Sequence, residues 1–167
     1  DPALDRPALN TLRRAGCRGL RLQVWTGSAE LARELKLGVD PDIALRICRD
    51  AALEGIDIRP LLQVGFPGEE QEPRQSTHAW LTRASEDLLA VDELSQCELR
   101  ACAPIGRTGE VYFPAEAPSR QWHDGGANNR PQRAVWVREA RTVCGALDLD
   151  HPGRASRQFP AVSEPGV

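Results

Sequence analysis

Hydrophobic residues along this chain alternate between a strand-like and a helix-like period. Runs in which every second residue is apolar predict three strands, at residues 20–25, 56–64 and 94–103. Segments with helical spacing lie before, between and after these strands. Because strand and helix alternate, the pattern predicts an α/β fold whose parallel sheet is built from βαβ units.

Helix ends are marked by residues that cap them. Asp5 and Asp40 are predicted N-caps, and Gly16 and Gly55 are predicted to close the same two helices. Helical spacing predicts two further helices, at residues 70–89 and 134–147, with a long Gly- and Pro-rich loop at 104–131 between them. Residues 1–147 are therefore expected to form one domain, and residues 148–167, which lack periodicity, a flexible tail.

Each predicted strand has one apolar and one polar face. In a sheet that helices cover on both sides, the strands are apolar on both faces. Helices are expected on the apolar face only. The polar face should then line a ligand-filled space, as in a parallel-stranded partial (β/α) barrel, here an incomplete half-barrel of about three βα units. A half-exposed sheet is the alternative. The polar-face residues are Arg21, Gln23, Arg59, Gln63, Glu98 and Arg100.

Glycine-bearing loops follow all three predicted strands. They read "TGSAE" after Val24, "GFPGEE" after Val64 and "PIGRTGE" after Ala103. Glycine lets a backbone approach a ligand closely, and ligands of parallel α/β sheets bind at the carboxyl ends of the strands. These loops are therefore the predicted site.

The composition of the chain bears on its partners and its location in the cell. The net charge of −3 gives no electrostatic reason to expect nucleic acid as a partner. No apolar run is long enough to predict a membrane span. Five scattered cysteines, an odd number, favour reduced thiols and a cytoplasmic location. The chain has no methionine, so we expect it to be part of a longer protein.

Several motifs occur here in a familiar order. "AGC" ends the first helix at residues 15–17, "TGS" follows the first strand, "EGI" precedes the second strand, and "GFPGE" follows it at residues 65–69. "PIGRTG" after the third strand is a looser match. This order resembles the second half of the barrel of radical S-adenosylmethionine (radical SAM) enzymes. The likeness is closest to the group that often carries a cobalamin-binding domain upstream, and it covers about two thirds of the chain.

The resemblance implies a function and a set of site residues. Radical SAM enzymes use a [4Fe–4S] cluster to cleave S-adenosylmethionine reductively into a deoxyadenosyl radical, and cobalamin is a further cofactor of the similar group. Carried over by position, Thr26, Gly27 and Ser28 would lie near the ribose or carboxylate of S-adenosylmethionine. Gly65, Pro67 and Gly68 would lie near the adenine, and Pro104 and Ile105 would flank it. Gln63, on the polar face, is a further candidate for contact with the cofactor.

This sequence departs from the family pattern in several ways. Thr26 replaces a serine, and Leu37 stands where a basic residue is expected, with Lys36 one position off. The cluster motif CxxxCxxC is absent, so the N-terminal half of the barrel is expected upstream, and this chain alone should not turn over. Trp25 stands where the family has an acidic residue. A degenerate half-barrel that serves as a binding or interaction module is therefore an alternative to the enzyme fragment. An unrelated α/β domain with an anion-binding "GFPGEE" loop is a third, weaker hypothesis.

The substrate is not indicated by the sequence, and some side chains keep two interpretations. Arg59 and Arg100 are candidates for pairing with a substrate carboxylate or phosphate, or Arg100 pairs with a polar-face neighbour such as Glu98. Glu69 either positions a loop backbone or ligand amine, or caps the helix that follows it.

Overall fold

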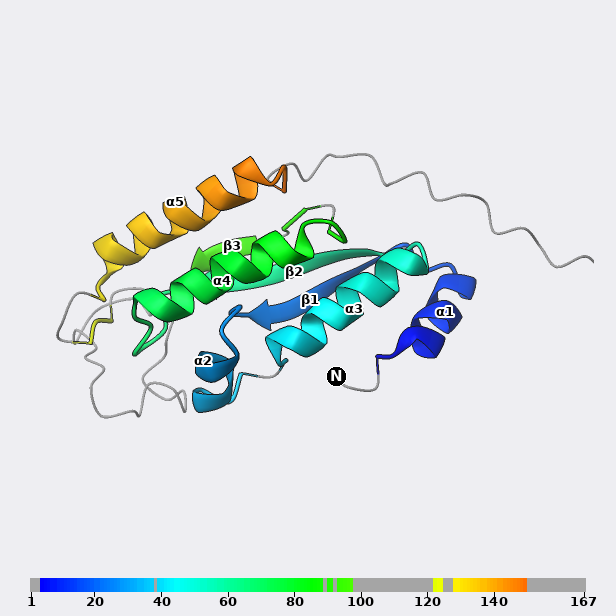
Figure 1. Cartoon of the computed structure of the whole chain (residues 1–167). Helices are drawn as coiled ribbons and strands as arrows, with labels where there is room; N and C mark the ends of the chain where they lie inside the picture. Colours follow the sequence, from blue (N-terminus) through cyan, green and yellow to red (C-terminus); the bar gives the residue numbers. More distant parts are fainter. Residues whose placement is uncertain are drawn as a thin grey trace, which may run out of the picture.

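The computed structural model describes residues 4–37, 39–88, 90–91, 93–97, 122–124 and 128–149. Within these residues helices and strands alternate along most of the chain, as Figure 1 shows. In chain order the elements are α1 Arg6–Arg14, β1 Gly19–Trp25, α2 Ala29–Glu34, α3 Pro41–Leu53, β2 Asp57–Val64, α4 Gln71–Ala84, β3 Glu93–Gln96 and α5 Arg130–Ala146.

The three strands form one open parallel sheet in the order β1-β2-β3. The prediction of an α/β fold with a parallel sheet is thus confirmed. Arg21 of β1 lies opposite Arg59 of β2, and Gln63 of β2 lies opposite Ser95 of β3. Opposed residues of neighbouring strands point to the same face, so the predicted polar residues of β1 and β2 do share one side.

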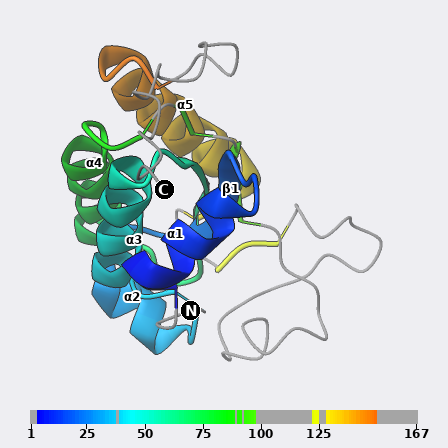
Figure 2. The same cartoon turned by 90° about the vertical axis from the view of Figure 1, so that its right-hand side faces the viewer.

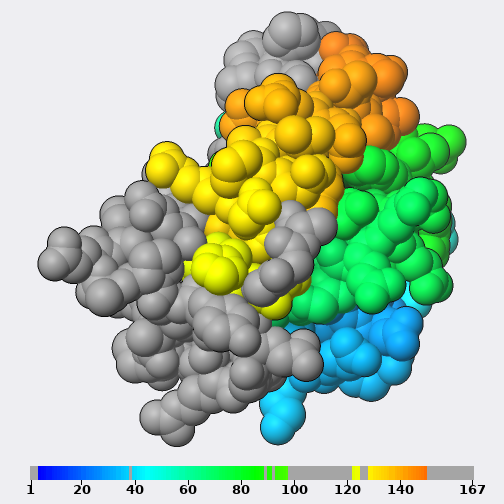
Figure 3. All heavy atoms as spheres, turned by 90° about the vertical axis from the view of Figure 1, so that its left-hand side faces the viewer, coloured from blue at the N-terminus to red at the C-terminus, as the bar shows by residue number. Residues whose placement is uncertain are grey.

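The apolar side of the sheet carries the main core. Leu22, Val24, Ile58 and Leu62 are buried there, together with residues of α3, α4 and α5. Figures 1 and 2 show α3 and α4 side by side on this face, and α4 and α5 form adjoining surface in Figure 3. On the opposite face Arg21 and Gln23 are exposed and Arg59 and Gln63 are half-buried.

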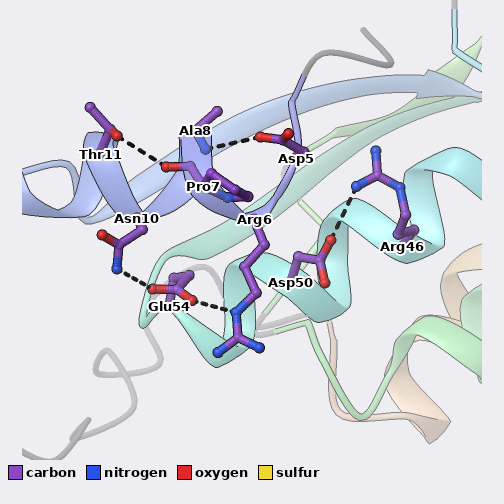
Figure 4. Close-up of polar contacts among 9 residues, drawn as sticks. All are labelled: Asp5, Arg6, Pro7, Ala8, Asn10, Thr11, Arg46, Asp50 and Glu54. Carbon is purple, nitrogen blue, oxygen red and sulfur yellow. Dashed lines mark hydrogen bonds and ion pairs between the residues drawn. The ribbon is translucent and has the colours of Figure 1, made fainter.

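Helix α1 is tied to α3 by the carboxylate of Glu54. Arg6 Nε lies 2.6 Å from Glu54 Oε1, and Asn10 Nδ2 donates to Glu54 Oε2 at 2.7 Å (Figure 4). The predicted caps are also present: Asp5 Oδ1 accepts from the N–H of Ala8 at 3.0 Å, and Asp40 Oδ1 accepts from the N–H of Asp42 at 2.9 Å.

Two predicted boundaries need correction, and one helix was not predicted. Helix α5 begins at Arg130, inside the predicted loop, because Asn129 caps it and Pro131 occupies its first turn. Helix α2 was not predicted, although Ser28 is its N-cap. Strand β3 ends at Gln96, while residues 98–103 of the predicted third strand lie outside the described residues.

The chain stays packed just after the end of α5. Leu149 is 1% exposed, and its carbonyl accepts from the N–H of Val91 at 3.1 Å. Residues 150–167 lie outside the described residues. None of the helices in the described ranges combines the length and the apolar character needed to cross a bilayer.

Candidate functional site

The loops that follow β1 and β2 leave the same edge of the sheet, because both strands are parallel and hydrogen-bonded to each other. The first loop comprises residues 26–28 and the second residues 65–69. Both loops are held by helices that follow later in the chain: α4 holds the first loop, and α5 with the residues before it holds the second.

The first loop starts with an unusual turn. Trp25 has a φ of 67°, and the N–H of Thr26 donates to the carbonyl of Val24 at 2.9 Å. A hydrogen bond between residues two positions apart, with a positive φ at the residue between them, defines the rarer and strained form of the γ-turn. The buried hydroxyl of Thr26 then accepts from the N–H of Ser28 at 3.2 Å and lies 3.3 Å from the hydroxyl of Thr77.

Gly27 is required by the close approach of α4. A Cβ at this position would lie 2.6 Å from Thr77 Cα and 2.6 Å from Trp80 Cβ, which leaves no room for a side chain. The N–H of Gly27 donates to Thr77 Oγ1 at 3.0 Å. Ser28 Oγ accepts from the N–H of Leu31 at 3.2 Å and caps α2. The side chains of Thr26 and Ser28 are therefore engaged within the protein.

The second loop is closed by the side chain of Glu69. Its Oε2 accepts from the N–H groups of Gly65 and Phe66, the latter at 2.9 Å. The interpretation of Glu69 as a helix cap is wrong, because the N-cap of α4 is Glu70, which makes no capping bond with its side chain. Glu69 instead positions the loop backbone, as the other interpretation held.

The carboxyl of Glu69 is poorly solvated. Only 3% of the residue is exposed, and this burial raises the pKa of Glu69 to about 7, against the opposing effects of its two backbone N–H donors and of Arg74. No residue in the described part of the chain donates a hydrogen bond to its Oε1. The side chain is therefore divided between its neutral and charged forms near pH 7.

Arg133 of α5 supports the second loop from the other side. The residue is fully buried, and its aliphatic stem lies against the Cα of Gly65. Its guanidinium lies 4.1 Å from the centroid of the Trp122 ring and donates to the carbonyl of Trp122 at 3.0 Å and to Asn128 Oδ1 at 3.1 Å. Burial lowers the pKa of Arg133.

Asn128 and Trp122 extend this support to two strand ends. Asn128 Nδ2 donates to the carbonyl of Phe66 at 2.8 Å, and Trp122 Nε1 donates to the carbonyl of Cys97, just after β3, at 3.1 Å. Sequence reasoning missed Arg133, Asn128 and Trp122. The one available signal was the helix start "NNRPQR", which places Asn128 and Arg133 around the beginning of α5.

The predicted site residues are only partly brought together. Gly65, Pro67 and Gly68 lie in one loop, with Pro67 buried and open space beside the Cα of Gly68. Gln63 is half-buried on the polar face. Arg59 lies on that face four residues earlier in β2, roughly 13 Å from Gln63 along the strand. Pro104, Ile105 and Arg100 lie outside the described residues.

The surroundings of Gly68 do not suit an anion. A hollow of about 180 Å³ lies beside it, between α2 and the start of α4. The described residues that line it include four with carboxylates and none with a basic side chain: Glu30, Glu34, Glu70 and Glu72. This charge disfavours the hypothesis of an anion-binding "GFPGEE" loop.

Metal-ligating side chains do not converge in the described ranges. No group of three or more His, Cys, Asp or Glu residues there is placed to hold a metal ion. Cys17, Cys48, Cys97 and Cys144 are not joined in disulfides. An iron–sulfur cluster needs converging thiolates, so this part of the chain does not fit one.

Comparison of the sequence with models of protein families gives no match, and comparison with curated proteins gives none either.

Proposed function

We propose that this chain is the C-terminal part of a radical SAM-like (β/α) barrel that contributes adenosyl and substrate contacts, with the iron–sulfur cluster held outside it. The observation that carries the proposal is the arrangement of the sheet. Its strands follow one another in sequence order, they are parallel, and the packed helices share the apolar face.

The handedness of the connections between the strands explains why this arrangement supports a barrel. Crossovers between parallel strands are right-handed. When successive crossovers step along the sheet in one direction, they place their helices on the same face, as in a (β/α) barrel. A doubly wound sheet reverses direction and carries helices on both faces. The exposed Arg21 and Gln23 and the half-buried Gln63 then belong to a lumen that the other barrel strands would complete.

Within this proposal the two loops have different roles. Gln63 and the backbone of residues 65–68 would contact the adenosyl group, because Gln63 lies on the polar face and Gly68 borders open space. Thr26 and Ser28 would act indirectly, since their hydroxyls bind the loop and α2. The bound cofactor would supply the radical chemistry. A cytoplasmic location and an upstream cobalamin-binding domain belong to the same proposal.

Titration of the ¹⁵N-labelled chain with 5′-deoxyadenosine tests this assignment. We expect amide chemical-shift changes that map to residues 63–68 and that weaken in the Gln63→Ala variant. The matched control is Gln71→Ala, which removes the same side chain from the exposed start of α4. Shift changes confined to other parts of the chain, or none at millimolar ligand, would contradict the proposal.

A non-catalytic binding module is the second candidate. The internal engagement of Thr26 and Ser28 and the presence of Trp25 at the acidic position favour it. The coding sequence upstream of Asp1 separates the two candidates. A CxxxCxxC motif there supports the enzyme, and its absence supports the module.

A further inference from the structure

A groove of about 360 Å³ lies beside the outer edge of β3, between this strand and α5. It is separate from the loops of the proposed adenosyl site. One wall is the strand itself, through Leu94, Ser95 and Gln96, and the other is a stretch of α5 that starts at Arg130. Leu94 O accepts from Arg141 Nη2 at 3.4 Å, which joins the two walls at one end.

The strand wall offers backbone groups for pairing. Among the strands that the structure describes, β3 is the last in the sheet order, and the N–H of Cys97 donates to the carbonyl of Val64 in β2 at 2.8 Å. Backbone groups of alternate residues point to alternate sides of a parallel strand. Ser95 therefore also faces β2, while the N–H and C=O of Leu94 and Gln96 face the groove. In addition, the buried Gln96 Oε1 receives no hydrogen bond from the described residues.

The helix wall is strongly basic. Arg130, Arg138 and Arg141 line the groove and are exposed, and none of the described residues that line it is acidic. Val137 and Ala134 lie between these arginines and supply an apolar floor. The one acidic residue of this helix, Glu139, interacts with His78 of α4. Burial lowers the pKa of His78, and the charge of Glu139 offsets part of that effect.

We infer that this groove binds an acidic, extended peptide segment of a partner protein, which adds to the edge of β3 as a fourth strand. An edge strand pairs through its backbone, and the side chains of the added strand provide specificity. Acidic side chains on the face of that segment that points toward α5 meet the three arginines. The charge of the groove is what selects an acidic partner.

The probe for this inference is a capped octapeptide of alternating valine and glutamate, titrated into the ¹⁵N-labelled chain. We expect the amide of Gln96 to shift and to exchange its proton more slowly in the complex. Arg138→Glu should weaken binding about tenfold or more, because it replaces an attraction by a repulsion. The matched control is Arg49→Glu, the same charge change at an exposed position on α3.

A second peptide separates strand pairing from charge attraction alone. N-methylation at alternate residues removes the donors needed to pair with β3 and leaves the charge unchanged. Loss of binding by this peptide supports the inference. The inference would be overturned if the two peptides bound equally well, or if Arg49→Glu weakened binding as much as Arg138→Glu does. It would also be overturned if the peptide did not bind at millimolar concentration.

Discussion

The aliphatic stem of Arg133 occupies the space directly above the Cα of Gly65. A Cβ built on Gly65 would overlap Cγ and Cδ of Arg133, and Gly65 has a φ of 86°. Two residues that are far apart in the sequence thus constrain each other. Glycine allows Arg133 to approach, and Arg133 holds the loop after β2 in position through Asn128 and Trp122.

Gly65→Ala should destabilise the protein by roughly 3 kcal/mol or more, because it adds a clash with a buried side chain to the strain of a positive φ. The free energy of unfolding, measured by urea denaturation, checks this expectation.

Gly68→Ala is the matched control for that variant. Gly68 has a φ of 74° but open space beside it, so the strain of the backbone acts alone and should amount to about 1 kcal/mol. Equal destabilisation by the two variants would show that the contact with Arg133 contributes nothing.

The raised pKa of Glu69 predicts a dependence of stability on pH. The folded protein holds the proton of Glu69 up to about pH 7, whereas the unfolded chain releases it near pH 4.5. Between these values the native state binds more protons than the unfolded state, so this group lowers the stability by roughly 3 kcal/mol as the pH rises from 4.5 to 7.

Glu69→Gln should remove this dependence, since the amide oxygen still accepts from the loop N–H groups and does not titrate. Urea denaturation between pH 4 and 8 gives the comparison, with the exposed neighbour Glu70→Gln as the control. If the wild-type protein and Glu69→Gln change in parallel with pH, Glu69 does not titrate in this range.

Thr77 is predicted to hold the first loop through its hydroxyl group. Thr77 is fully buried, and its Oγ1 accepts from the N–H of Gly27 and donates to the carbonyl of Pro73 at 3.1 Å. Thr77→Val leaves the partly buried N–H of Gly27 without its partner and should lower the free energy of unfolding by about 2 kcal/mol.

Thr77→Ser keeps the hydroxyl and loses one buried methyl group, so it should be destabilising by only about 1 kcal/mol. Hydrogen exchange at the amide of Gly27 reports on the bond directly. It should accelerate in Thr77→Val and change little in Thr77→Ser. If Thr77→Ser destabilised the protein more than Thr77→Val, the methyl group of Thr77 and not its hydroxyl would hold the loop.

The described cysteines should differ in their reactivity. Burial raises the pKa of Cys48 to about 12, so this thiol hardly ionises at neutral pH. Cys17 is half-buried, while Cys97 and Cys144 are buried like Cys48. Iodoacetamide should therefore label Cys17 first among these four in the native protein, as followed by peptide mass spectrometry. Labelling of Cys48 at a similar rate would show that α3 opens readily.

Much of the fold could be predicted because its signals are local. Period-two alternation marks the strands and their faces, and the caps at Asp5 and Asp40 mark helix starts through contacts with residues two or three positions away. Helix α2 was missed because it is six residues long and its cap, Ser28, lies in a stretch that the family resemblance assigned to cofactor binding.

The sequence by itself determined the alternation of strand and helix and the polar face that carries Arg21 and Arg59. Tertiary structure alone decided the partners of those loops. Glu69 closes its own loop rather than capping α4, Thr77 binds Gly27, and Arg133 packs on Gly65. The reason is physical: periodicity and capping arise between residues close in the chain, whereas burial and hydrogen bonding between distant segments depend on how the helices pack against the sheet.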